Sequence, residues 1–134
     1  MLPGMVARDA GHVANMGPTA GEWPCPGGKV YGATRAFVRQ LGHDLRADLH
    51  GTRVRVTDIE PGLVGGTEFS AVRFAGDGAK AAGVHAGTEP LVPEDIADAV
   101  HWAATRLARV NVNLLQAMPV APSCGPLRVH RRAS

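Results

Sequence analysis

A helical pattern bracketed by two strand patterns constrains the fold of this chain most. From about residue 30 to residue 49, apolar side chains recur every four positions, which is typical of an amphipathic helix. HVANM (residues 12–16) precedes it and is typical of a short buried strand, while RVRVTDI (residues 53–59) follows it and alternates apolar with polar residues. The apolar stripe consists of Phe37, Leu41, Leu45 and Leu49. A strand–helix–strand order favours two parallel strands covered by the helix.

The same order continues toward the C-terminus. A second helix is predicted to begin at Pro93, a favoured first helical position, with Glu94 and Asp95 suited to the positive end of the helix dipole. A last strand is predicted over residues 111–118, and the Gly/Ala-rich, weakly patterned segment 68–90 is expected to be mobile. The apolar side of the second helix is expected to comprise Ile96, Val100, Ala103, Ala104 and Leu107. We therefore predict an α/β fold with a parallel sheet of about three strands and two main helices.

Composition narrows the setting. The chain has 134 residues, of which 45% are hydrophobic and 19% charged, and this is typical of one globular domain. No apolar run reaches the roughly 18 residues of a membrane span, and residues 1–10 lack the apolar stretch of a secretory signal. Cys25 and Cys124 are too far apart in the sequence to form a metal-binding motif. We expect a cytoplasmic protein with no metal site and no membrane partner.

The positive charge is concentrated at the C-terminus. The formal net charge is +2, and Arg128, Arg131 and Arg132 lie within the last nine residues. Because the remainder of the chain is slightly acidic, the basic character belongs to the tail and does not predict a nucleic-acid partner. We divide the chain into a main domain, residues 1–120, and a basic tail, residues 121–134.

Several motifs in order carry a family resemblance. They are HVANM with the following glycine, TAG (residues 19–21), WP (23–24), YGAT (31–34) and DIEPGLVGGTEF (58–69). With them, residues 2–120 resemble the C-terminal half of the short-chain dehydrogenase/reductase family, and most of all its NADP-dependent 3-hydroxy acid (serine-type) dehydrogenases. The resemblance implies part of a doubly wound, Rossmann-like sheet, and hydride transfer between a nicotinamide and a small hydroxy acid or alcohol.

The resemblance also assigns catalytic positions, two of which depart from the family pattern. Tyr31 corresponds to the tyrosine that exchanges a proton with the substrate oxygen. The lysine position one helical turn later is Arg35, which supplies charge but has a planar fork in place of an ammonium. The serine position is Pro18, which has neither a hydroxyl nor a backbone N–H, and the adjacent Thr19 is one residue out of register.

Cofactor contacts are implied for the loop after the second strand. The resemblance implies NADP, with NAD as the alternative, and assigns Tyr31 and Arg35 to cofactor binding as well as to catalysis. The loop contacts would come from Pro61, Gly62, Leu63, Val64, Gly65, Gly66, Thr67, Glu68 and Phe69. Residues from about 69 to 90 would form a lid over a small-molecule substrate.

The family's glycine-rich cofactor loop has no counterpart in this sequence, since no G-x-G-x-x-G follows a strand. It would lie before Met1. We therefore expect doubtful cofactor binding by this chain alone and little or no turnover, given Pro18 and Arg35. Two alternatives follow: a non-catalytic interaction module that pairs with itself or with a full-length homologue, and a truncated gene product without activity of its own.

Overall fold

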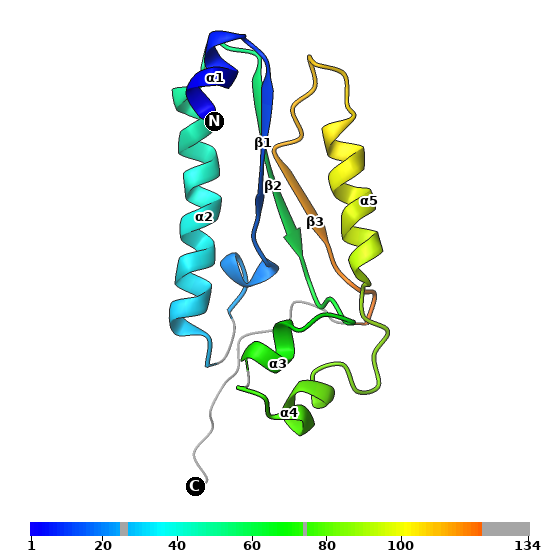
Figure 1. Cartoon of the computed structure of the whole chain (residues 1–134). Helices are drawn as coiled ribbons and strands as arrows, with labels where there is room; N and C mark the ends of the chain where they lie inside the picture. The colour runs from blue at the N-terminus through cyan, green and yellow to red at the C-terminus, as the bar shows by residue number, and fades with distance from the viewer. Residues whose placement is uncertain (25–26, 74, 122–134) are drawn as a thin grey trace, which may run out of the picture.

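The computed structural model describes residues 1–24, 27–73 and 75–121 (Figure 1). Its centre is a parallel sheet in the order β1-β2-β3. The long helix α2 and the helix α5 lie on opposite sides of this sheet (Figure 1). The bounds are Gly11–Met16 for β1, Val54–Pro61 for β2, Leu114–Ala117 for β3, Lys29–Asp48 for α2 and Pro93–Ala104 for α5. The predicted α/β class, with three parallel strands and two main helices, is confirmed.

Four shorter helical segments complete the described chain. They are α1 (Leu2–Ala7), the 3₁₀ helix η1 (Thr19–Gly21), α3 (Phe69–Arg73) and α4 (Gly78–Gly83). The last two lie in the segment expected only to be mobile, where weak periodicity gave no sign of a helix. Local bonds start them: the Val72 amide donates to the Glu68 carbonyl at 2.9 Å, and the Lys80 amide donates to the Asp77 carboxylate at 3.1 Å. Such short helices depend on end contacts and not on an apolar stripe.

The central strand β2 is buried on both faces. Val54 and Val56 pack with Leu49 of α2, as the predicted alternation requires. Thr57 and Ile59, on the opposite face, are at most 1% exposed. A strand between two parallel neighbours and two helix layers has no solvent face.

Polar side chains of β2 are paired across the sheet. The ring of His12 in β1 lies 2.7 Å from the Thr57 hydroxyl, and the Asn15 amide donates to the Asp58 carboxylate at 2.9 Å. Arg55 donates to backbone carbonyls at the end of α5, including that of Ala104 at 2.8 Å. Because a buried polar group without a partner is costly, these pairs fix the register of β1, β2 and α5.

Several predicted apolar positions are exposed, both near the end of α5 and along α2. Helix α5 ends at Ala104, so Leu107 lies beyond it and is 60% exposed, and its predicted place on the buried side is wrong. Ile96 and Ala103 of the same helix are buried as expected. The predicted stripe of the first long helix divides, because Leu49, which directly follows α2, enters the core while Phe37 and Leu41 are 66% and 47% exposed.

The last strand is shorter than the predicted 111–118, and Asn111 explains its late start. The Asn111 side chain accepts a hydrogen bond from the Val56 amide and donates one to the Val56 carbonyl, both at 2.8 Å. This side chain occupies the backbone groups that a longer β3 would pair with. The ladder therefore begins only at Leu114, opposite Asp58.

Within the described ranges, no helix is both long and apolar enough to cross a membrane, and no three metal-ligating side chains form a group. The tail from residue 122 onward, with its three arginines and Cys124, lies outside the described residues, as does Cys25.

Gly42 provides a test of the packing between α2 and β2. A Cβ atom at this position would lie 2.7 Å from Cγ of Asp58 and would collide with both carboxylate oxygens. We expect Gly42→Ala to lower the free energy of unfolding by about 1–3 kcal/mol, as overpacking does. Urea denaturation measures this. Gly78→Ala is the matched control, because a Cβ there meets open space, and an equal loss in both variants would contradict the expectation.

His12 should make stability depend on pH. Burial, and then the charge of Arg55, lower the pKa of His12 below its ordinary value of 6.5. The folded state therefore binds this proton less tightly than the unfolded state, so His12 favours folding fully above pH 6.5 and loses that effect as pH falls through its folded pKa. We expect the free energy of unfolding to fall between pH 7.5 and 5.5, and to fall less in His12→Gln. The exposed His43, changed to Gln, should leave the slope unaltered.

Candidate active site

A hollow of about 360 Å³ opens where β1 and β2 end. In open α/β sheets, ligands bind at the carboxyl ends of the parallel strands, so its position is that of a functional site. The hollow is lined by Met16, Gly17, Pro18, Tyr31, Arg35, Pro61, Gly62, Val64, Thr67 and Phe69. Three separate segments meet there: the end of β1, the first turns of α2, and the loop after β2.

Two arginine side chains and one aromatic ring surround the ring of Tyr31. The Arg35 guanidinium carbon lies 5.0 Å from the centroid of the Tyr31 ring, and that of Arg73 lies 5.7 Å from it. The Phe69 ring is tilted by 48° to the tyrosine ring, with 6.1 Å between the centroids. Two guanidinium groups therefore lie within cation–π distance of one phenol ring.

Arg35 has one group unused by the protein. Its Nε atom is buried and has no hydrogen-bond partner among the described residues. A buried donor without a partner is costly. The spacing of Tyr31 and Arg35 on one helix face, predicted from the sequence, is what brings both to the hollow.

Pro18 lines the hollow but offers it no hydrogen-bond donor. It stands at the start of η1 with φ −77° and ψ 160°, an extended conformation that proline adopts without strain. Its neighbour Thr19 is not among the residues that line the hollow. Of these two neighbours, only Pro18 lines the hollow.

The predicted loop residues divide into two sets. Pro61, Gly62, Val64, Thr67 and Phe69 line the hollow. The remaining predicted residues, Leu63, Gly65, Gly66 and Glu68, do not.

Backbone bonds explain this second set. The Leu91 amide donates to the Leu63 carbonyl at 3.0 Å, and the Gly65 amide donates to the Leu91 carbonyl at 2.8 Å. Gly66 turns the chain with φ +69°, a conformation that favours glycine. The Glu68 carbonyl accepts the bond that starts α3. These four residues therefore determine the backbone conformation of the loop, and the residues next to them line the hollow.

Three residues of the site were not predicted. Met16 and Gly17 line the hollow, and Arg73 lies over the Tyr31 ring. Met16 and Gly17 could have been found, since they end β1 at the edge where the tyrosine helix begins. Arg73 carries no such signal, because its position depends on α3, which the sequence pattern did not predict.

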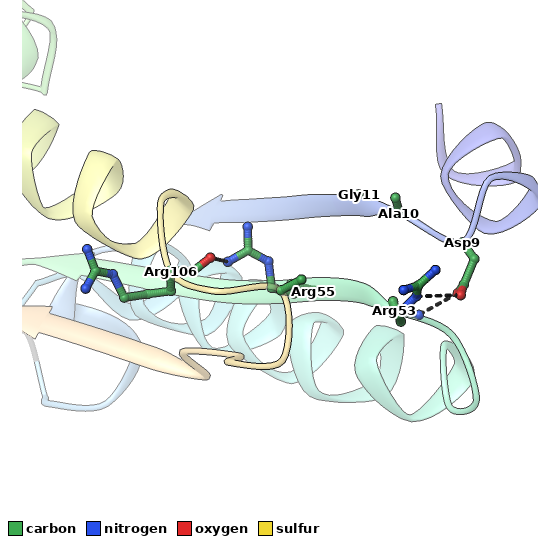
Figure 2. Close-up of a pocket in the computed structure, with 7 residues that line it drawn as sticks. Asp9, Ala10, Gly11, Arg53, Arg55 and Arg106 are labelled. Carbon is green, nitrogen blue, oxygen red and sulfur yellow. Dashed lines mark hydrogen bonds and ion pairs between the residues drawn. The ribbon is translucent and has the colours of Figure 1, made fainter.

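A second hollow of similar size lies at the opposite edge of the sheet, and Figure 2 shows its lining. It contains three arginines, but protein groups already bind their side chains. Arg53 pairs with Asp9 at 2.8 Å, Arg55 donates to carbonyls at the end of α5, and the Arg106 guanidinium stacks on Trp102 at 4.8 Å. The Arg53–Asp9 pair also lowers the pKa of Asp9, chiefly through the hydrogen bond from the Arg53 amide. The three arginines of this hollow are therefore engaged by other groups of the protein.

The fold and the first hollow define a class: an α/β protein with a tyrosine and a cation at the carboxyl ends of parallel strands. The family model described as "short chain dehydrogenase" matches residues 1–78. The chain belongs to the short-chain dehydrogenase family.

Individual relatives agree with this assignment. The NADP-dependent 3-hydroxy acid dehydrogenase of Salmonella typhi is 62% identical over 131 residues, which cover 98% of this chain and 53% of that protein. Sulfoacetaldehyde reductase 2 of Chromohalobacter salexigens is 45% identical over 132 residues, 98% of this chain and 52% of its own. The closed form of a serine dehydrogenase complexed with NADP⁺ superposes with a TM-score of 0.96 at 61% identity, over 98% of this chain and 53% of that structure. The chain thus spans about half the length of these relatives.

Proposed function

We propose that this chain carries the part of an NADP-dependent oxidoreductase site that contains the catalytic tyrosine. The site would transfer a hydride to or from a small hydroxy acid or alcohol. The observation that supports it is the meeting of Tyr31, Arg35 and the Pro61–Phe69 loop around one hollow at the carboxyl ends of the strands. The relatives named as dehydrogenases of 3-hydroxy acids and serine support this substrate class. The cytoplasm is the compartment that we propose for this activity.

The residues of the hollow fit the nicotinamide end of the cofactor. The Arg35 guanidinium and the Thr67 hydroxyl offer hydrogen-bond donors, and the hydroxyl also offers an acceptor. The volume of about 360 Å³ suits a nicotinamide ring with a small substrate. When bound, the nicotinamide supplies or accepts the hydride. Pro61, Gly62, Val64, Thr67 and Phe69 are the loop residues that we assign to holding it.

In this proposal Tyr31 moves the proton. Its hydroxyl donates to, or accepts from, the substrate oxygen, while Arg35 provides positive charge beside the ring. A guanidinium stays protonated, so Arg35 does not pass the proton onward. Pro18 offers the substrate oxygen no hydrogen bond. We therefore propose that these two residues impair turnover.

Restoring the two side chains tests the proposal. We expect Pro18→Ser with Arg35→Lys to raise the rate of NADP⁺ reduction with a 3-hydroxy acid by about 10²-fold, the size of a general acid–base contribution. The extended backbone at position 18 accepts serine, and lysine keeps the charge near Tyr31. NADPH formation at 340 nm, with single and double variants at equal concentration, gives the measurement.

Tyr31→Phe in the double variant is the control. It keeps the ring that packs against Phe69 and removes only the hydroxyl, so it should return the rate to background. A double variant that stays inactive at saturating substrate and cofactor, or a Tyr31→Phe variant that keeps the gained rate, would contradict the proposal.

A second candidate function is association, and the outer surface of α2 favours it. Val30, Phe37 and Leu41 share one face of this helix and are 76%, 66% and 47% exposed. Such a row of apolar side chains is typical of a surface that binds another chain. The occupant that we propose is a second copy or a full-length homologue. Sedimentation of Phe37→Asp beside the unchanged chain separates the two functions, since association would be lost while Tyr31 chemistry is untouched.

A further inference from the structure

Four polar side chains outside the hollow connect its two loops. Arg39 Nη1 lies 3.3 Å from Oε2 of Glu22, and Arg39 Nε lies 3.7 Å from Oε1 of Glu60. The side-chain amide of Gln116 donates to Glu22 at 2.9 Å and to Glu60 at 3.1 Å. One cation and one amide thus bridge the same two carboxylates. We call Glu22, Arg39, Glu60 and Gln116 the bridging cluster.

The cluster joins the segments that form the site. Glu22 directly follows η1, in the loop that contains Pro18, and Glu60 directly precedes the loop that begins at Pro61. Arg39 lies one helical turn beyond Arg35 in α2. Gln116 is the β3 residue directly opposite Glu60 in the sheet register. Both loops are therefore anchored to each other through side chains that do not line the hollow.

Burial shows why the bridge is costly to break. Glu60 is 2% exposed, and its two carboxylate oxygens meet Arg39 in an ion pair and the Gln116 amide in a hydrogen bond. A buried carboxylate that loses its cation is left uncompensated. The hydrogen bond from Gln116, followed by the charge of Arg39, lowers the pKa of Glu22. Glu22 therefore stays ionised and available for bridging at neutral pH.

We propose that Arg39 is a positioning residue, which sets the separation of the Pro18 loop and the Pro61–Phe69 loop by bridging Glu22 and Glu60. This inference rests on the proposed function, since the loops are those assigned to substrate and nicotinamide. A general contribution to folding is the alternative. The apolar core of Leu49, Val54 and Val56 lies toward the other end of α2 and β2, so loosening the bridge should act locally.

Amide hydrogen exchange of the full chain tests the bridge without any activity. The Gly17 amide donates to the Ile59 carbonyl at 2.9 Å, and the Gly62 amide donates to the Ala117 carbonyl at 2.7 Å, so each reports on one loop. We expect Arg39→Met to speed exchange of both amides by about tenfold and to leave the Val56 amide, bonded to Asn111, unchanged. Arg39→Lys should restore most of the protection. Arg46→Met, an exposed arginine of the same helix, is the matched control.

Kinetics supply the second readout. In the Pro18→Ser, Arg35→Lys chain we expect Arg39→Met to lower kcat about tenfold while KM for NADP⁺ changes less than twofold, because misplaced groups slow the chemical step. Arg39→Lys should recover at least half of kcat. Equal changes in kcat and KM, or no recovery with lysine, would overturn the positioning role.

The remaining outcomes separate the two proposals. Uniformly faster exchange, the Val56 amide included, or unchanged exchange at both glycines overturns the bridge. Inactivity of every variant overturns the proposed function, while the exchange result still decides the bridge. If Arg39→Met fails to fold, Glu22→Gln replaces it, since Glu60 then keeps its cation. That variant should speed exchange of the Gly17 amide more than that of Gly62, and equal effects would overturn the inference.

Discussion

The strand β2 has polar side chains in the interior of the molecule, and neighbouring strands and helices supply their hydrogen-bond and ion-pair partners. Thr57 and Asp58 bind side chains of β1, while Arg55 binds carbonyls at the end of α5. Glu60 is held by α2 and β3 together. Because each pair costs free energy when it is broken, the sheet has one register and the two helices one placement on it.

Along the face of β2 that packs against α2, the contacts change from apolar to charged. Leu49 meets Val54 and Val56 at one end. Gly42 then admits the Asp58 carboxylate. Because α2 runs antiparallel to β2, the helical turns that precede Gly42 in the sequence lie closer to the carboxyl end of the strand.

Farther along this face, Arg39 meets Glu60, and Arg35 and Tyr31 line the hollow. The apolar end contributes to the core, and the charged end places side chains around the hollow. This gradient explains how one helix can serve both the core and the site.

The sequence predicts the repeating parts of this arrangement. Apolar residues at every fourth position identify α2, and short apolar runs identify β1 and β2. These periodicities follow directly from helix and strand geometry. The four-residue spacing of Tyr31 and Arg35 likewise predicts that they share a helix face. Position 18 also lies at the hollow.

What the sequence could not predict depends on pairs that form only after folding. Glu60 and Gln116 are far apart in the chain and meet through the register of β2 and β3. Asn111 shortens β3 by binding the backbone of Val56, a contact that no periodicity encodes. Arg73 reaches Tyr31 from the short helix α3, which has no apolar stripe. Local sequence patterns thus specify the helices and strands, whereas polar pairs between residues far apart in the sequence specify how the ends of those helices and strands are placed relative to one another.

The two departures from the family pattern leave the frame of the site undisturbed. Pro18 stands where the backbone is extended, and its carbonyl still accepts the hydrogen bond from Gly21 that closes η1. The preceding Gly17 amide donates to the Ile59 carbonyl of β2, so the start of this loop is bonded to the sheet. Arg35 lies against the Tyr31 ring and replaces one cation by another. Because neither residue belongs to the pairs that hold β2, the chemistry of the site and the stability of its scaffold depend on different side chains.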